Sequence, residues 1–216
     1  PEALMNFLGL FFIQIAEGEE LMTMDQLIDK FDADNLNKSG AVFDTQKLEW
    51  LNGRFLRETL TEEEFILRVA AWASENARLK EGLKLSQSRI TKLGELPALM
   101  GFLLQSDMVP EAAAFAKIKK TNPAEILEIL QAVQPVLEKL VEWNAATVEE
   151  ALRQLSEDMD KKLRTVVAPL FVAMSGSSRS LPLFDSMAIL GRAVVRQRLK
   201  TAEGVVAAMV AEEAGK

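Results

Sequence analysis

Helix-start signals recur along the whole chain and constrain its fold more than any other feature. A capping box sets a small polar residue three positions before Glu, Gln or a similar side chain, and each side chain accepts a hydrogen bond from a backbone N–H that the helix leaves unpaired. The chain has this spacing at Thr23 and Gln26, Thr61 and Glu64, and Thr147 and Glu150. Asn122 precedes Pro123 and Glu125, and proline suits the first helical position because its missing N–H would have no partner there.

Apolar residues recur at helical spacing after these starts. After Asn122 the apolar positions include Ile126, Leu127, Leu130 and Val133, and Pro135 predicts either a kink or two short helices. A further start is expected at Asp44 and Thr45, and helix ends are expected at Gly53, Gly82, Gly94 and Gly191. The one candidate strand is Leu170–Met174, "LFVAM". We therefore expect an all-α protein of about ten helices joined by short loops.

The composition excludes several kinds of active site. The 216 residues contain no cysteine and no histidine, which removes disulfides, thiol chemistry, the commonest metal ligand and the usual base at neutral pH. A stand-alone enzyme would have to use paired carboxylates, and no spaced carboxylate motif supports one. "DADNLNKSG" lacks the glycine of a calcium loop, and "SGSSRS" lacks the Gly-Lys-Ser/Thr ending of a phosphate-binding loop. We expect no catalytic residue, no metal and no cofactor in this chain.

Charge is distributed unevenly along a chain whose net charge is −7. Residues 17–34 are acidic, whereas residues 78–92 and 179–200 each carry five basic residues against one acidic residue. The basic residues of the second stretch are Arg179, Arg192, Arg196, Arg198 and Lys200. Such stretches are either solvated helix faces or local surfaces for phosphate, and charge alone leaves both open.

Three segments resemble bacterial-type glutamyl-tRNA synthetase: "PEALMNFL" (1–8), "NKSGAVFDTQKLEWLNGRFLR" (37–57) and "PLFDSMAILGRAVVRQRL" (182–199). The resemblance runs in order from the first residue to about residue 200. It implies a stem-contact subdomain at residues 1–60 and a helical anticodon-binding domain at residues 61–216, with a division of the latter near residue 140 left open.

The family's Lys-Ile/Met-Ser-Lys loop and its histidine-containing nucleotide motif are absent. The resemblance therefore implies the C-terminal part of a class I glutamate–tRNA ligase, inactive on its own, whose parent uses ATP and Mg²⁺. The implied partner is tRNA(Glu), with tRNA(Gln) left open, and no DNA or membrane partner is expected of a cytoplasmic, monomeric parent. The alternative is a helical scaffold that binds another protein through an apolar groove.

The resemblance also implies which residues contact the anticodon. In "LSQSRITKLGEL" (85–96), Arg89 matches an arginine that reads the third base, although it could instead be an ion-pair partner within the bundle. The loop that begins at Ser175 matches the segment that contacts the first two bases. The loop positions carried over are Ser175, Gly176, Arg179, Ser180, Leu181 and Leu183.

Two of these positions depart from the family pattern. Phe171 stands where the family has an arginine, and Leu181 stands where it has a proline. Phe171 either stacks on a base or belongs to the core, and Arg179 is a candidate to replace the missing cation.

The segment 37–57 divides into an expected core and an expected RNA-facing ridge. Phe43, Leu48, Trp50 and Leu51 are expected in the core. The residues expected to face the tRNA stem are Lys38, Lys47, Asn52, Arg54 and Arg57.

Overall fold

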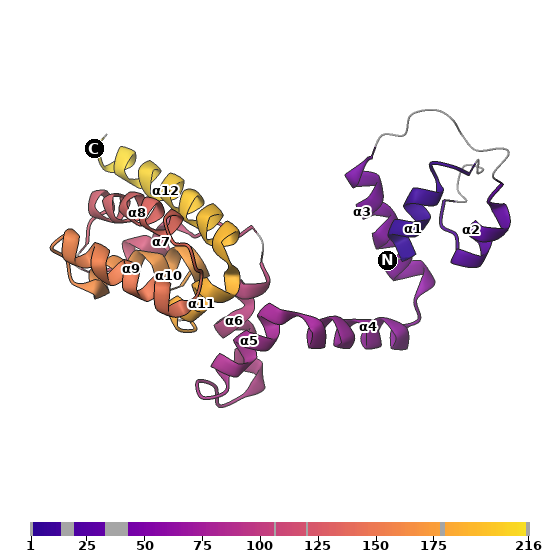
Figure 1. Cartoon of the computed structure of the whole chain (residues 1–216), viewed down its shortest axis with the longest axis horizontal. Helices are drawn as coiled ribbons and strands as arrows, with labels where there is room; N and C mark the ends of the chain where they lie inside the picture. The colour runs from indigo at the N-terminus through magenta and orange to yellow at the C-terminus, as the bar shows by residue number, and fades with distance from the viewer. Residues whose placement is uncertain are drawn as a thin grey trace. The chain divides into compact units, whose positions relative to one another are not determined.

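The computed structural model describes residues 2–13, 20–32, 43–105, 107–119, 121–177 and 180–214 (Figure 1). Within these ranges all regular structure is helical, with twelve α-helices, one π-helical segment and two 3-10 segments. The all-α prediction is confirmed. The candidate strand at Leu170–Met174 is wrong, because these residues lie in helix α10 (Leu163–Ser175).

The chain divides into two compact units, residues 1–72 and 73–216. The division falls within α4 (Glu62–Glu75). It is a division by packing, so the functional boundary expected at residues 60 and 61 stays a prediction.

The first unit packs α1 (Glu2–Gly9) against α2 (Met24–Lys30) and α3 (Thr45–Arg54), which continues as a π-helical segment, Phe55–Thr59. Phe7 is buried and meets the edges of the Phe11 and Phe43 rings at centroid distances of 4.9 and 5.1 Å. Asn6 is also fully buried. Its carboxamide donates to Glu20 O at 2.5 Å and accepts from Met22 N at 3.0 Å, which fixes the segment before α2 against α1.

The second unit contains one core built from α5 to α12. Its helices are α5 (Ala77–Ser86), α6 (Leu96–Met100), α7 (Ala112–Ala116), α8 (Pro123–Glu138), α9 (Ala145–Asp158), α10, α11 (Leu183–Leu190) and α12 (Arg192–Ala214), with 3-10 segments at Leu93–Glu95 and Gly101–Leu104. Helix α12 packs along α8, and α11 packs on α9 (Figure 1). Fully buried side chains from α8, α9, α10 and α12 meet in this core, including Ile129, Leu152, Leu170 and Leu199.

Most of the predicted helix starts are confirmed. Thr23 and Gln26 form a capping box, and Asp44 accepts hydrogen bonds from the backbone of residues 46 and 47 at the start of α3. Thr61 and Glu64 exchange the same pair of bonds before α4, at 2.8 and 3.2 Å. Asn122 Oδ1 accepts from Glu125 N at 2.8 Å.

The predicted start at Thr147 and Glu150 is wrong. Helix α9 begins three residues earlier, because Asn144 Oδ1 accepts from Thr147 N at 2.9 Å while Asn144 N donates to Thr147 Oγ1 at 3.2 Å. Thr147 therefore occupies the third helical position instead of the cap. Asparagine is the stronger N-cap residue of the two, which explains the choice.

Helix α8 continues through Pro135, so the alternative of two short helices is wrong. Val133 and Leu137 are both buried on either side of the proline. Burial of this apolar stripe offsets the hydrogen bond that the proline cannot donate.

The predicted helix ends are right at Gly191 and wrong at Gly53 and Gly82. Gly191 follows α11 with φ of 80°, a backbone conformation that residues other than glycine rarely adopt. Gly53 and Gly82 lie inside α3 and α5. A β-carbon at residue 82 would stand 2.6 Å from Leu103 Cδ1 and 2.8 Å from Met100 Cε, so close packing explains that glycine.

The expected core of segment 37–57 is confirmed only in part. Leu51 is fully buried and Leu48 is half-buried, whereas Trp50 and Phe43 are 47% and 55% exposed. None of the described helices is long and apolar enough to cross a membrane.

Candidate nucleic-acid interface

Arg89 lies in a turn just after the end of α5. Asn76 caps the start of this helix, and Arg89 N donates to Ser86 O at 2.8 Å where the helix ends. The Arg89 side chain is exposed and forms no ion pair with any described residue. The described residues thus give no support to the alternative that Arg89 is an ion-pair partner within the bundle.

The residues that follow the Arg89 turn are held by hydrogen bonds of their own. Glu95 accepts from Thr91 N at 3.1 Å and from Thr91 Oγ1 at 2.9 Å, and these bonds hold the pKa of the Glu95 carboxyl below its usual value. Lys92 and Leu93 are exposed between these two residues, Leu93 by 77%. This arrangement leaves a cation and an apolar side chain facing solvent next to Arg89.

The loop after α10 begins with a left-handed glycine. Gly176 has φ of 69° and donates its N–H to Val172 O at 2.8 Å. Ser175 Oγ lies 2.8 Å from Phe171 O and 2.9 Å from Ser177 O, and its single hydrogen can be donated to only one of them at a time. Ser175 is therefore occupied with ending the helix, and Ser180 Oγ donates to Leu181 O at 3.0 Å.

Two of the residues expected to contact the anticodon have buried side chains. Leu181 and Leu183 are 0% and 4% exposed and belong to the core. Phe171 is half-buried and packs against the same core, which favours the core alternative over a stacking platform. Arg179, the candidate to replace the missing cation, lies outside the described residues.

The loop after α10 packs on α5, the helix that ends just before the Arg89 turn. Leu181 Cδ1 lies 3.8 Å from the place of a β-carbon at Gly82, beside Leu103 and Met100. Ser86 Oγ, near the end of α5, donates to Gly82 O at 2.7 Å. Both segments that were expected to contact the anticodon are thus attached to α5.

A buried arginine ties the end of α10, just before the loop, to the core. Arg198 is 1% exposed and donates to the carbonyl oxygens of Met174, Phe102 and Gln105. Burial, with a smaller contribution from Arg78, lowers its pKa to about 10. Counting Arg198 in a basic surface was therefore wrong.

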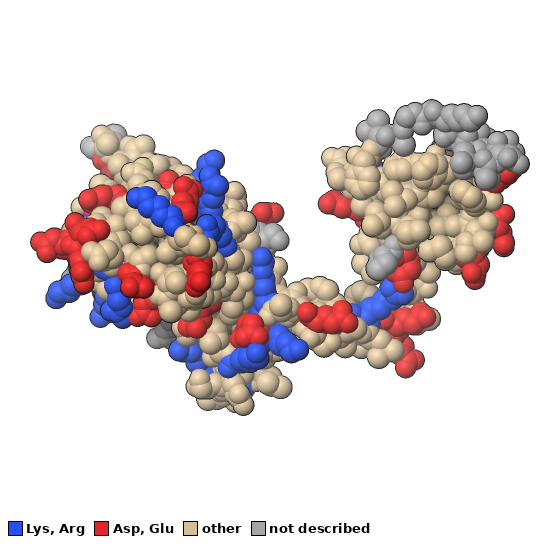
Figure 2. Space-filling view, viewed as in Figure 1, with Lys and Arg blue, Asp and Glu red and all other residues tan. Residues whose placement is uncertain are grey.

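The rest of the basic stretch 179–200 is largely engaged within the protein. Arg192 donates to the carbonyl oxygens of Leu140 and Val141, and Arg196 Nε lies 3.3 Å from Glu138 Oε1. Figure 2 shows Lys and Arg interspersed with Asp and Glu over the second unit. The alternative of a local surface for phosphate at 179–200 is therefore not supported by the described residues of this stretch.

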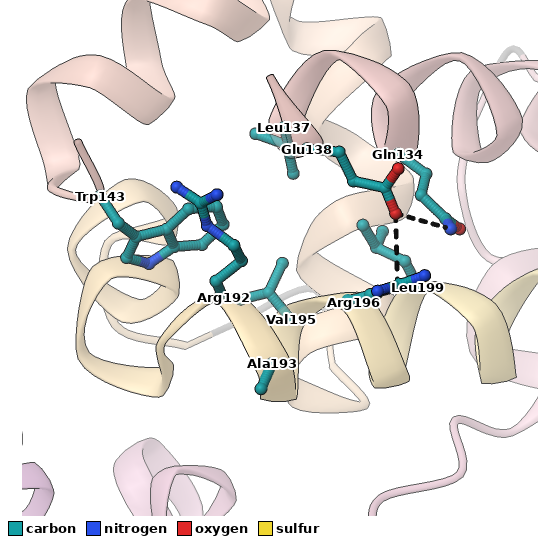
Figure 3. Close-up of a pocket in the computed structure, with 9 residues that line it drawn as sticks. All are labelled: Gln134, Leu137, Glu138, Trp143, Arg192, Ala193, Val195, Arg196 and Leu199. Carbon is teal, nitrogen blue, oxygen red and sulfur yellow. Dashed lines mark hydrogen bonds and ion pairs between the residues drawn. The ribbon is translucent and has the colours of Figure 1, made fainter. Parts of the chain in front are cut away.

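A groove of about 470 Å³ lies between α8 and α12 (Figure 3). Trp143 forms one wall, and its Nε1 donates to Met187 O at 3.0 Å while the Arg192 guanidinium lies 5.5 Å from its ring centroid. Gln134 Nε2 lies 3.4 Å from Glu138 Oε1, the oxygen that pairs with Arg196. Both arginines of the groove are thus already paired within the protein.

In the first unit, α3 places Lys47, Trp50 and Arg54 on one face. Asn52 is five residues from Lys47 and so lies about 140° around the helix, on another face. Arg54 binds both carboxylate oxygens of Glu58, at 3.0 and 2.8 Å, and lies 5.1 Å from the Trp50 ring centroid. This pairing lowers the pKa of Glu58, and it leaves Arg54 less available to phosphate than Lys47.

Arg57 lies back across α3. Its Nη1 is 3.0 Å from the place of a β-carbon at Gly53, its side chain is exposed, and no described residue pairs with it. Lys47 and Arg57 are therefore the unpaired cations of the expected ridge, and Lys38 lies outside the described residues. Among the described residues no acidic cluster suited to a metal ion is found.

Two family models match the chain. Residues 56–203 match the anticodon binding domain, and residues 1–50 match the catalytic domain of the class I tRNA synthetases (E and Q). The first match covers more than half of the 216 residues.

Two glutamate–tRNA ligases are similar to this chain over most of its length. The chain is 70% identical over 210 residues to a glutamate–tRNA ligase of Rhizobium johnstonii, covering 97% of this chain and 43% of the ligase. A glutamate–tRNA ligase of a Psychrobacter species is 36% identical over 207 residues, covering 95% of this chain and 40% of that protein. The chain thus spans less than half the length of these relatives.

A solved structure shares the fold. The glutamate tRNA ligase of Elizabethkingia meningosepticum, in complex with its amino acid, aligns with a TM-score of 0.53 at 21% identity. The alignment covers 94% of this chain and 41% of that protein. At this identity the likeness shows a common fold.

Proposed function

Because this chain belongs to the anticodon-binding domain family, we propose that it binds the anticodon and inner stem of tRNA(Glu) within a glutamate–tRNA ligase. The anticodon would meet the surface formed by the Arg89 turn and the loop after α10. The observation that carries the proposal is Arg89 itself, an exposed arginine with no ion-pair partner among the described residues, in the turn after the helix on which Leu181 packs.

The chemistry of Arg89 suits an unpaired base. A guanidinium offers a planar fork of donors to the edge of a base and can also stack on its face. Single-stranded loops are where proteins read RNA sequence, because the bases there can turn outward. Polar groups of the loop after α10 would add hydrogen bonds to neighbouring bases, and the buried side chains of Leu181 and Leu183 would anchor this segment to the core.

The first unit would contact the RNA backbone instead. Lys47 and Arg57 are exposed cations on α3 and its π-helical continuation. Phosphate contacts position an RNA without reading its sequence. We therefore assign the orientation of the stem to these two residues and the reading of identity to the second unit.

The chemistry of the whole ligase would be performed outside the anticodon-binding residues. The parent would use ATP and Mg²⁺ to attach glutamate to tRNA, in the cytoplasm and as a monomer. Whether it charges tRNA(Gln) as well would depend on how strictly the third anticodon base is read.

The experiment compares Arg89→Ala with Arg164→Ala in the full-length ligase that contains this chain. Arg164 is an exposed arginine at the opposite end of α10 from the loop, about 16 Å of helix away. Binding is measured for tRNA(Glu) and for variants altered at each anticodon position. Arg89→Ala should reduce discrimination at one position by on the order of tenfold to a hundredfold, and Arg164→Ala should not.

Two results would contradict the proposal. An equal loss of affinity for every anticodon variant would mean that Arg89 does not read a base. An absence of tRNA binding even at low salt would favour the alternative of a scaffold for another protein.

A further inference from the structure

We propose that Arg198 is a positioning residue for anticodon recognition, which holds the loop after α10 in register with the segment that follows the Arg89 turn. The inference rests on the proposed function and deepens it, since Arg198 itself would not touch the RNA. It is buried, and its donors face three backbone carbonyls of this chain.

The three carbonyls belong to the two segments in question. Met174 O lies near the end of α10, directly before Ser175 and Gly176, where a helix leaves its last carbonyls unpaired. Phe102 O and Gln105 O lie at the end of the 3-10 segment that follows α6, and they accept from Arg198 Nη2 at 2.7 and 2.5 Å. One side chain therefore ties together backbone segments that are about seventy residues apart along the chain.

The same two segments also meet at Gly82. Leu103 belongs to the 3-10 segment, Leu181 belongs to the loop, and both approach the place of a β-carbon at Gly82 on α5. Met108 adds a further contact, since its Sδ lies 3.6 Å from the place of a β-carbon at Gly176. The position of the loop relative to α5, and so to Arg89, thus depends on the bonds that Arg198 makes.

Stability alone is a poor explanation of a charge at this place. Burying an arginine is costly, because the loss of hydration of the guanidinium offsets much of what its hydrogen bonds contribute. Part of this cost is not compensated, because the Arg198 Nε is buried without a hydrogen-bond partner among the described residues. A methionine would fill the same space, but it could not join three carbonyls.

The test uses the full-length ligase and the variant Arg198→Met, alone and combined with Arg89→Ala. Arg198→Met should reduce anticodon discrimination about tenfold, and the double variant should lose little more than Arg89→Ala alone, because the two residues act through one surface. Val133→Ala, a core truncation in α8, serves as the control for lost stability. It should leave the discrimination between anticodon variants unchanged.

A second variant covers the case in which Arg198→Met does not fold. Arg198→Lys keeps the charge but cannot reach three carbonyls with the fork of an arginine. It should show faster amide exchange at Gly176 and Ser177 and a smaller loss of discrimination.

The outcomes separate the two proposals. If the unaltered ligase does not discriminate between anticodon variants, the proposed function fails. If it discriminates and both Arg198 variants do so equally well, or if Val133→Ala loses as much discrimination as Arg198→Met, only the role of Arg198 is overturned.

Discussion

Gly82 of α5 lies directly beneath Leu103, whose Cδ1 is 2.6 Å from the place that a β-carbon would take. Because this residue has no side chain, the 3-10 segment and the loop after α10 can both pack against α5. The glycine therefore belongs to the packing of the candidate site and not to the end of a helix.

Substituting Gly82→Ala should destabilise the second unit by about 1–3 kcal/mol, because the added methyl group must displace Leu103 and Met100 in a filled core. Gly204→Ala is the matched control, since it is also a glycine inside a helix but nothing lies within 4 Å of the place of its β-carbon. Gly204→Ala should stabilise by roughly 0.5–1 kcal/mol through helix propensity. Denaturant unfolding measures both, and similar effects at the two positions would contradict the packing role.

Asn144→Ala should destabilise α9 by about 1 kcal/mol, because the variant loses the side chain that caps the helix. Glu150→Ala should change the free energy of unfolding by less than about half of that, since Glu150 is exposed and lies beyond the cap. Thermal or urea unfolding of the two variants compares them directly. A larger effect at Glu150 would place the start of the helix at Thr147 after all.

The pairing of Glu2 with Arg68 predicts a pH dependence of the first unit. Arg68 Nη2 lies 2.6 Å from Glu2 Oε1, and this bond lowers the pKa of Glu2 from 4.5 to about 2. Because the folded-state pKa is the lower one, the stabilisation is present above pH 4.5 and is lost as the pH falls from 4.5 towards 2. Titration of the Glu2 carboxyl by NMR should give a midpoint near 2, and Arg68→Met should return it towards 4.5.

If the midpoint of Glu2 is unchanged in Arg68→Met, the pairing is not the cause of the shift. Glu2→Gln provides the matching measurement on stability. Its unfolding should depend less on pH in the same window than that of the unaltered chain.

Lys47→Ala and Arg57→Ala should weaken tRNA binding equally for every anticodon variant and should each reduce the slope of log K against log salt by about 1. Arg54→Ala should change this slope less, because Arg54 is paired with Glu58. Affinities measured at several salt concentrations supply the slopes. A loss confined to one anticodon variant would remove Lys47 and Arg57 from the backbone contacts.

Local signals in the sequence predicted the helical class and most helix starts. The caps at Thr23, Thr61 and Asn122 depend on residues three positions apart, so their partners can be found without knowledge of the tertiary structure. The start of α9 was missed because Asn144 and Thr147 offer two overlapping caps. Choosing between them required the relative strengths of the two side chains.

Tertiary contacts account for the remaining errors. Gly82 leaves room for the Leu103 side chain, and Arg198 donates to three carbonyls that are distant in sequence. Neither role can be recognised from the neighbouring residues. A glycine within an otherwise well-formed amphipathic helix, and a basic residue at an apolar helix position, were the available signals. For the candidate site, the motif resemblance supplied the segments, whose contact with RNA stays a prediction, whereas the burial of Leu181 and Leu183 could come only from the fold.

The three tryptophans differ in environment in a way that supplies an optical probe of the two units. Trp50 and Trp72 belong to the first unit and are 47% and 54% exposed, whereas Trp143 belongs to the second unit and is half-buried, with its indole N–H bonded to Met187 O. The emission of Trp143 should therefore be blue-shifted relative to the other two and should move to longer wavelength when α9 and α11 separate. In a chain with Trp50 and Trp72 replaced by phenylalanine, fluorescence would follow the unfolding of the second unit alone.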